Sequence, residues 1–143
     1  MQCDEIMTRK VISVGTTDTV KTAAQLMRDA DIGFLPVCDP VTGAVLGAIT
    51  DRDLAIRLVA EDRLSNTLVG EVMTPEVVWC APTDDVITAE RLMGKHQKSR
   101  ILCLDAARKP VGVISLSDLA QSEEEPRVAE TVRQVTARET QVP

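Results

Sequence analysis

Two eight-residue stretches of the chain each combine a hydroxyl side chain with an aspartate three residues later. Residues 47–54 read GAITDRDL and residues 112–119 read GVISLSDL. In both, an apolar run ends at the hydroxyl residue, Thr50 or Ser115, and the residues that follow favour the first turn of a helix. A helix N-terminus has free N–H groups and a positive dipole, so it suits an anion such as phosphate.

The two aspartates, Asp53 and Asp118, suit a different part of such a ligand. A carboxylate accepts hydrogen bonds from the two hydroxyls of a ribose but repels phosphate, so hydroxyl residue and acid would bind opposite parts of one nucleotide. The same spacing is also typical of a capping box, in which both side chains satisfy backbone N–H groups. Both interpretations are open for one motif alone, and its recurrence within a larger repeat favours ligand binding.

The motif recurs because the chain contains a tandem duplication. Four other features reappear 66 residues later, and the octapeptide follows at an offset of 65, which one deletion in a loop explains. The pairs are Met7-Thr8 with Met73-Thr74, residues 17–20 with 83–86, Leu26-Met27 with Leu92-Met93, and residues 33–39 with 99–105. We divide the chain into a first repeat (1–62), a second repeat (63–121) and an acidic C-terminal tail (122–143) with a helical spacing of valines.

Each repeat is predicted to follow the order β-α-β-β-α. Short β-branched or apolar runs predict the strands, and apolar residues at helical spacing predict the helices. The expected strands are 11–14, 34–39, 44–50, 77–80, 100–104 and 110–114, and the expected helices are 20–30, 85–97 and those opening at 51 and 116. Residues 16–18 supply N-cap candidates for the first helix.

One such repeat would leave an apolar sheet face uncovered. A unit of about 55 residues is marginal alone, and two copies can cover each other. We therefore expect an α+β fold in which the repeats pack sheet to sheet around a pseudo-twofold axis, with two related clefts between them.

Composition narrows the classes of function. The chain has 143 residues and a formal net charge of −6, with no basic stripe, so we expect no DNA or RNA partner. No apolar run approaches the roughly 20 residues of a membrane span, so no membrane partner is expected. The first ten residues, MQCDEIMTRK, lack the basic and apolar regions of a signal peptide. A cytoplasmic location is expected, with cysteines 3, 38, 80 and 103 reduced.

Catalytic and metal chemistry have little support. His96 is the only histidine, no Cys-x-x-Cys spacing occurs, and no nucleophile–base pair is evident. We therefore expect no enzyme, no catalytic residues and no metal site. A thiol or metal sensor that uses some of Cys3, Cys38, His96 and Cys103 is an alternative.

On these residues the sequence resembles a tandem pair of cystathionine-β-synthase (CBS) domains, a Bateman module, over about residues 3–121. The resemblance rests on the two Met-Thr pairs, on residues 33–37 (GFLPV) and on both octapeptides. The chain is also similar to small stand-alone bacterial CBS pairs. The resemblance implies a non-catalytic regulatory module for adenosine ligands: AMP, ADP, ATP or S-adenosylmethionine, as regulatory ligand and not as cofactor. It further implies a homodimer and an effector protein that receives the signal; a constitutive scaffold with vestigial clefts is the alternative.

In the family, each cleft takes its aspartate from one repeat and its base-binding strands from the other. Carried over to this chain, the resemblance implies two sets of ligand-binding residues: Ser115, Ser117 and Asp118 facing Ile12, Gly33 and Phe34, and Thr50 and Asp53 facing Val78, Ser99 and Arg100. Arg100 and Arg52 give basic groups to the Asp53 cleft only, because Phe34 and Ser117 stand at the matching positions. Arg grips phosphate bidentately, so we expect this cleft to bind phosphorylated nucleotides more tightly.

Overall fold

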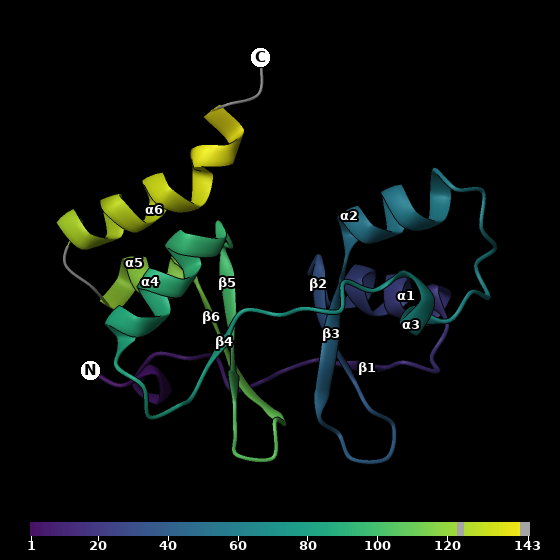
Figure 1. Ribbon diagram of the computed structural model, residues 1–143, viewed down its shortest axis with the longest axis horizontal. Helices are drawn as coiled ribbons and strands as arrows, with labels where there is room; N and C mark the ends of the chain where they lie inside the picture. The colour runs from purple at the N-terminus through teal and green to yellow at the C-terminus, as the bar shows by residue number, and fades with distance from the viewer. Residues whose placement is uncertain (123–124, 141–143) are drawn as a thin grey trace. The chain divides into compact units, whose positions relative to one another are not determined.

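The computed structural model describes residues 1–122 and 125–140 (Figure 1). Its elements follow the duplicated order predicted from the sequence. The first repeat contains β1 (Val14–Gly15), α1 (Val20–Ala30), β2 (Phe34–Cys38), β3 (Val45–Thr50), α2 (Asp51–Asp53) and η2 (Leu54–Val59). The second contains β4 (Trp79–Cys80), α4 (Val86–His96), β5 (Arg100–Leu104), β6 (Pro110–Ser115) and α5 (Leu116–Ser122). Three further elements are η1 (Cys3–Glu5), α3 (Val69–Val72) and α6 (Glu125–Thr140).

Each repeat forms a three-stranded sheet, in the orders β1-β2-β3 and β4-β5-β6. The first two strands of each sheet are parallel and the last two antiparallel, with an irregularity at Val37/Cys38 that recurs at Cys103/Leu104. The turns that join the antiparallel strands also match, since Gly43 (φ 76°) and Arg108 (φ 61°) both adopt positive φ. The two-repeat α+β fold predicted from the sequence is confirmed.

The ends of the long helices show the duplication again. The C-cap residues of α1 and α4 are Asp31 and Gln97, and both have the left-handed conformation with φ 54°. The predicted N-cap of α1 at residues 16–18 is wrong: Thr19 is the N-cap and accepts from the Thr22 N–H. Asp18 instead accepts from the Gly15 N–H at 2.7 Å, which holds the loop before the helix.

The helix that opens at Asp51 changes its hydrogen-bond pattern after one turn. α2 continues directly into the π-helical segment η2. At its end the Ala60 N–H reaches back five residues to the Ala55 carbonyl at 2.9 Å. Leu54 and Leu58 of this segment pack against the core of the unit, whereas Ile56 and Val59 are exposed.

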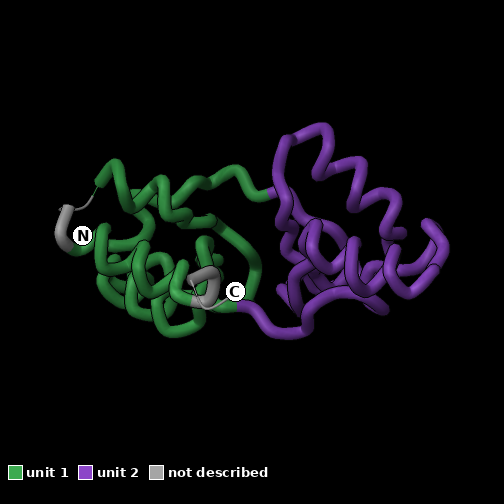
Figure 2. The backbone as a smooth tube through the Cα atoms, turned by 90° about the horizontal axis from the view of Figure 1, so that it is seen from above, with its two compact units in different colours: residues 1–11, 78–143 green, residues 12–77 purple. Residues whose placement is uncertain are grey.

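The chain forms two compact units, one of Ile12–Val77 and one of Met1–Val11 with the chain from Val78 onward (Figure 2). Each has its own apolar core. The core of the 12–77 unit lies between the sheet β1-β2-β3 and helices α1 and α3, and includes Val20, Leu35, Ile49 and Val69. That of the other unit includes Met93, Ile101, Ile114 and Leu119. Residues 1–11, which precede the strands of the first repeat, thus belong to the unit that contains the second sheet. The segment up to Val77, which precedes the strands of the second repeat, belongs to the unit that contains the first sheet.

The Met-Thr pairs lie in these exchanged segments and pair with a strand edge. Thr8 exchanges two backbone hydrogen bonds with Val113 of β6, at 2.8 and 3.0 Å. Thr74 does the same with Ala48 of β3, at 2.9 and 2.8 Å. Each bridge covers part of the free edge of a terminal strand.

The glycine that opens each octapeptide allows this close approach. A Cβ at Gly47 would collide with the Thr74 carbonyl oxygen and lie 3.1 Å from the Met73 sulfur. A Cβ at Gly112 would collide with the side chain of Met7. Gly47 is therefore required because the backbone of Thr74 crosses directly above it, whereas at Gly112 it is the Met7 side chain that lies over the glycine.

The C-terminal helix α6 packs on the second repeat beside α4 and α5 (Figure 1). Val135 is buried in the core of that unit, and Arg127 pairs with Glu90 of α4 at 3.0 Å. Residues 123–124 and 141–143, which belong to the predicted tail, lie outside the described residues. Within the described part of the chain, no helix has the length and apolarity needed to cross a bilayer.

The crossing above Gly47 predicts a graded set of alanine substitutions. Gly47→Ala should lower the free energy of unfolding by about 1–3 kcal/mol, because the added methyl meets backbone that cannot turn aside. Gly112→Ala should cost less, because the Met7 side chain can change rotamer. Gly15→Ala is the matched control: its Cβ would make ordinary contacts of 3.6 Å or more. Urea denaturation measures all three, and equal losses at Gly47 and Gly15 would contradict the role of the crossing.

Candidate functional site

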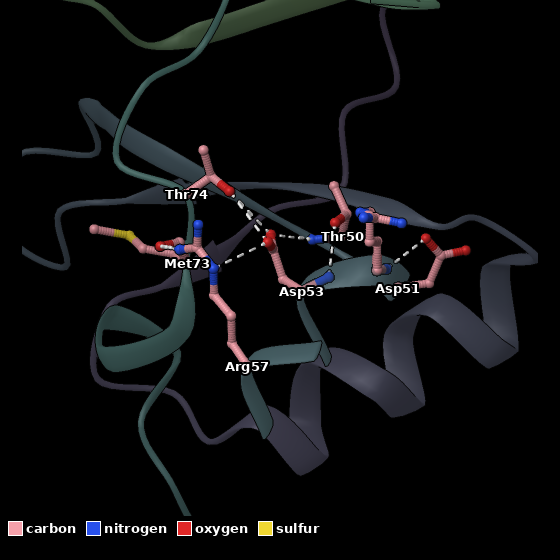
Figure 3. A network of polar contacts seen from close by, with 7 residues as sticks. Thr50, Asp51, Asp53, Arg57, Met73 and Thr74 are labelled. Atoms are coloured by element: carbon pink, nitrogen blue, oxygen red, sulfur yellow. Dashed lines mark hydrogen bonds and ion pairs between the residues drawn. The ribbon is translucent and has the colours of Figure 1, made fainter. Parts of the chain in front are cut away.

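The hydroxyl–aspartate motif of the first repeat forms a closed capping box at the β3–α2 corner (Figure 3). The Asp53 N–H donates to the Thr50 hydroxyl at 3.1 Å, and the Thr50 N–H donates to Asp53 Oδ2 at 3.0 Å. The Asp53 side chain is buried, with only a small part exposed. The aspartate therefore has one fixed orientation at the point where the strand becomes a helix.

Two residues outside the motif complete this network (Figure 3). The Thr74 hydroxyl lies 3.1 and 3.3 Å from the two carboxylate oxygens of Asp53, and Arg57 Nε lies 3.8 Å from Oδ1. Arg57 also donates to the Met73 carbonyl at 2.9 Å. The sequence analysis missed both residues. Arg57 could have been found from its position one helical turn after Asp53, whereas Thr74 is close only because its segment crosses β3.

The motif of the second repeat is built the same way but is more open. The Ser115 N–H donates to Asp118 Oδ2 at 2.8 Å, and the Ser115 hydroxyl lies 3.0 Å from the same oxygen. Ser117 lies 3.2 Å from Ser115, hydroxyl to hydroxyl. Within residues 1–122 and 125–140, no hydrogen bond reaches Asp118 Oδ1, and Thr8 makes no side-chain bond to Asp118 like the one from Thr74 to Asp53.

The capping interpretation therefore describes real contacts in both repeats, and it leaves room for a ligand. A carboxylate offers about four acceptor positions. Asp53 accepts from one N–H, one O–H and a distant guanidinium, and Asp118 accepts at one oxygen only. Both aspartates keep acceptor capacity for further donors.

Each unit brings together residues that were predicted from the sequence to line different clefts. In one, Phe34 is the register partner of Thr50, and the Asp51 N–H donates to the Gly33 carbonyl at 3.0 Å. In the other, Arg100 is the register partner of Ser115, and the Leu116 N–H donates to the Ser99 carbonyl at 3.1 Å. Residues at the start of the second strand and the end of the third strand of each sheet thus share one corner.

The remaining predicted residues divide into apolar and basic groups. Ile12 and Val78 are partly buried and pack against the cores of their own units. Arg52 and Arg100 are exposed, and neither forms an ion pair within the described part of the chain. Free guanidinium groups at these corners can attract an anion.

In residues 1–122 and 125–140, no group of three or more His, Cys, Asp or Glu residues is arranged to hold a metal ion.

Comparison with known proteins identifies the family. The model of the CBS domain matches residues 3–60 and 69–125, which together cover most of the chain. The CBS domain-containing protein YhcV of Bacillus subtilis is 37% identical over 116 residues, which is 81% of each chain. Hypoxic response protein 1 of Mycobacterium tuberculosis is 30% identical over 132 residues, 92% of this chain and 91% of that one.

Solved structures show the same fold. A crystal structure of hypoxic response protein I with two coordinated zinc ions has a TM-score of 0.76 at 29% identity, over 85% of this chain and 98% of that one. The CBS pair of MJ0100 in complex with 5-methylthioadenosine and S-adenosylmethionine has a TM-score of 0.73 at 23% identity, covering 85% of this chain and 94% of that one. CBSX2 in complex with AMP has a TM-score of 0.73 at 22% identity, with coverage of 85% and 94%.

Enzymes that carry the domain are larger proteins. Inosine-5'-monophosphate dehydrogenase of Methanocaldococcus jannaschii is 33% identical, but the match spans only 25% of its length. Relatives that are little more than the pair belong to a regulatory and not a catalytic class. The two matched domains, the duplicated fold and the paired hydroxyl–aspartate corners together show that this chain belongs to the CBS-domain family, as a tandem CBS pair.

Proposed function

We propose that this CBS pair binds an adenosine-containing ligand (AMP, ADP, ATP or S-adenosylmethionine) and transmits its presence to a protein partner or a second copy of the chain. One observation carries the proposal: each repeat fixes an aspartate at a helix N-terminus and leaves part of its carboxylate able to accept further hydrogen bonds. A capping box alone has no need of acceptor positions left open at both corners. Complexes of similar folds with AMP and with S-adenosylmethionine support an adenosine ligand.

Each part of the ligand has a chemically suitable partner. The ribose hydroxyls are proposed to donate to Asp53 or Asp118, since both carboxylates are held in place before binding. The base is proposed to meet apolar side chains and strand backbone near Ile12 and Val78. The hydroxyls of Thr50, Ser115 and Ser117 suit phosphate oxygens. The two residue sets predicted from the sequence remain the proposed contacts, Gly33, Phe34 and Ser99 among them.

The two sets differ in charge, which predicts different ligands. The set predicted for Asp53 includes Arg100 and Arg52 and the set predicted for Asp118 has no arginine, although within its own unit Arg100 is the register partner of Ser115. We therefore propose that phosphorylated nucleotides bind more tightly through the Asp53 set. The more open Asp118 set suits adenosine groups without phosphate.

A ligand can signal only if it binds one arrangement of the protein better than another. A homodimer or an effector protein would supply the alternative arrangement. The proposal thus requires that ligand binding change an association equilibrium.

Binding is tested by calorimetric titration of the purified chain with AMP, ATP and S-adenosylmethionine, with GMP as the base control. We expect saturable binding of at least one adenosine ligand and weaker binding of GMP. Trp79, the only tryptophan, provides an independent fluorescence signal. If no adenosine ligand binds at millimolar concentration, the protein is instead a constitutive scaffold.

The phosphate role is tested by Arg100→Ala. A charge-assisted hydrogen bond contributes about 1.5–3 kcal/mol, so AMP and ATP should bind roughly tenfold or more weakly, while adenosine affinity should stay nearly unchanged. Arg91→Ala is the matched control, because Arg91 is an exposed arginine of α4 outside both sets. Equal losses for adenosine and AMP would refute the phosphate role.

The ribose role is tested by Asp53→Asn and Asp118→Asn. The asparagine oxygen can still accept the strand N–H, so the corner keeps its fold, but the side chain loses its charge and one of its two acceptor oxygens. Each variant should bind adenosine several-fold more weakly and leave free adenine, which lacks ribose, unaffected. Circular dichroism checks the fold; an unchanged affinity for adenosine in both variants would show that the aspartates only cap.

A further inference from the structure

Three of the four cysteines meet inside one unit. Cys80 Sγ lies 3.7 Å from Cys3 Sγ and 3.7 Å from Cys103 Sγ. All three side chains are buried and belong to the same apolar core. The fourth, Cys38, lies in β2 of the other unit. The proposed ligand sites use none of these thiols.

The three thiols come from separate parts of the chain with different freedom to move. Cys80 and Cys103 are register partners on the parallel strands β4 and β5, so the sheet fixes their backbones. Cys3 opens the three-residue turn η1 near the N-terminus. Backbone hydrogen bonds hold that turn to the loop before α4, from the Cys3 N–H to Asp84 O at 2.8 Å and from the Asp4 N–H to Pro82 O at 2.9 Å.

Cys3 is also the thiol best prepared to react. The Cys80 thiol donates to the Cys3 sulfur, and the Cys3 thiol donates to the Asp85 carbonyl at 3.8 Å. The neighbouring Cys103 and Cys80 thiols lower the pKa of Cys3, although burial and the nearby Asp84 and Asp85 act in the opposite direction. The sulfurs of Cys103 and Cys3, followed by burial, raise the pKa of Cys80. The Cys3 sulfur and burial also raise the pKa of Cys103, although its hydrogen bond with Cys80 acts in the opposite direction. A thiolate is the nucleophilic form, so the chemistry starts at Cys3.

We propose that Cys3 and Cys80 form a reversible disulfide when the protein meets a hydroperoxide. The Cys3 thiolate attacks one peroxide oxygen, the O–O bond breaks, and hydroxide leaves behind a sulfenic acid on Cys3. The Cys80 sulfur then attacks the Cys3 sulfur, the S–O bond breaks, and the Cys80 proton leaves with the oxygen as water. Both cysteines are oxidised and one peroxide is reduced. A dithiol reverses the reaction by thiol–disulfide exchange.

Geometry favours this pair over the two strand cysteines. A disulfide needs its sulfurs about 2.05 Å apart, so each 3.7 Å contact must shorten. Between Cys80 and Cys103 that movement would distort two strands of a sheet. Between Cys3 and Cys80 it requires a shift of the three-residue turn η1 and the breaking of its backbone hydrogen bonds to the loop before α4, but no change in the pairing of β4 with β5. Opening of the same turn admits the oxidant.

The crosslink would have a large effect on the chain. The loop between Cys3 and Cys80 contains all of Ile12–Val77, the whole of the other unit. The bond would join the N-terminal segment, which leads into the 12–77 unit, to β4, which follows that unit. The chain would then enter and leave the 12–77 unit through two segments that are covalently linked to each other. Closing a loop of this length restricts the unfolded chain, so oxidation is expected to stabilise the protein against denaturant.

The test is peptide mapping of the full-length protein after treatment with hydrogen peroxide and alkylation of the remaining thiols. Trypsin places the four cysteines in four different peptides, residues 1–9, 29–52, 64–91 and 101–108. We expect a crosslink between peptides 1–9 and 64–91 that dithiothreitol removes. Oxidation should also raise the urea midpoint of the wild type and of Cys38→Ser, the matched control, but not that of Cys3→Ser.

Three results would overturn the proposal. One is a crosslink between peptides 64–91 and 101–108 in place of the expected one. Another is the absence of any crosslink while the protein remains folded. The third is crosslinking that is as fast in 8 M urea (about full denaturation for a small domain) as in buffer, because the folded structure would then have no part in choosing the pair. Cys3→Ala serves as a second variant if Cys3→Ser fails to fold.

Discussion

The corner at which the third strand of each repeat becomes a helix depends on one carboxylate. Asp53 and Asp118 each accept the N–H of the last strand residue and are themselves held by its hydroxyl. These bonds satisfy backbone groups that would otherwise lack partners at the helix N-terminus. They also hold a charged acceptor in one orientation. One arrangement of atoms therefore stabilises the turn and prepares a hydrogen-bonding site, and the capping and binding interpretations do not compete.

The two corners are unequal although both leading segments pair with a strand edge in the same way. Thr74 reaches Asp53 because its segment runs along β3, and Arg57 approaches from the following turn. Thr8 runs along β6 in the same way, yet Asp118 keeps an oxygen without a hydrogen bond from residues 1–122 or 125–140. Duplication supplied the same backbone twice, and substitutions at a few side chains changed its chemistry. Such differences would allow one CBS pair to distinguish two ligands.

Local patterns allowed much of the fold to be predicted. The strands from 34 to 50 and from 100 to 115, and the helices α1 and α4, follow from apolar runs and helical spacing. The first helix begins at Val20 as expected, but its N-cap is Thr19 and not one of residues 16–18, because Asp18 holds the preceding loop. The sequence around each Met-Thr pair does not indicate which strand the pair will lie beside. That pairing depends on which strand edge, distant in the sequence, is free. The same is true of Thr74 as a partner of Asp53 and of the meeting of three cysteines separated by up to 100 positions.

A crystal structure of the protein grown with AMP would show whether the aspartates hold the ribose. We expect density for the nucleotide with its ribose hydroxyls within hydrogen-bonding distance of Asp53 or Asp118. Density for AMP elsewhere, or both carboxylates bonded only to their own strand and helix in crystals saturated with AMP, would contradict it.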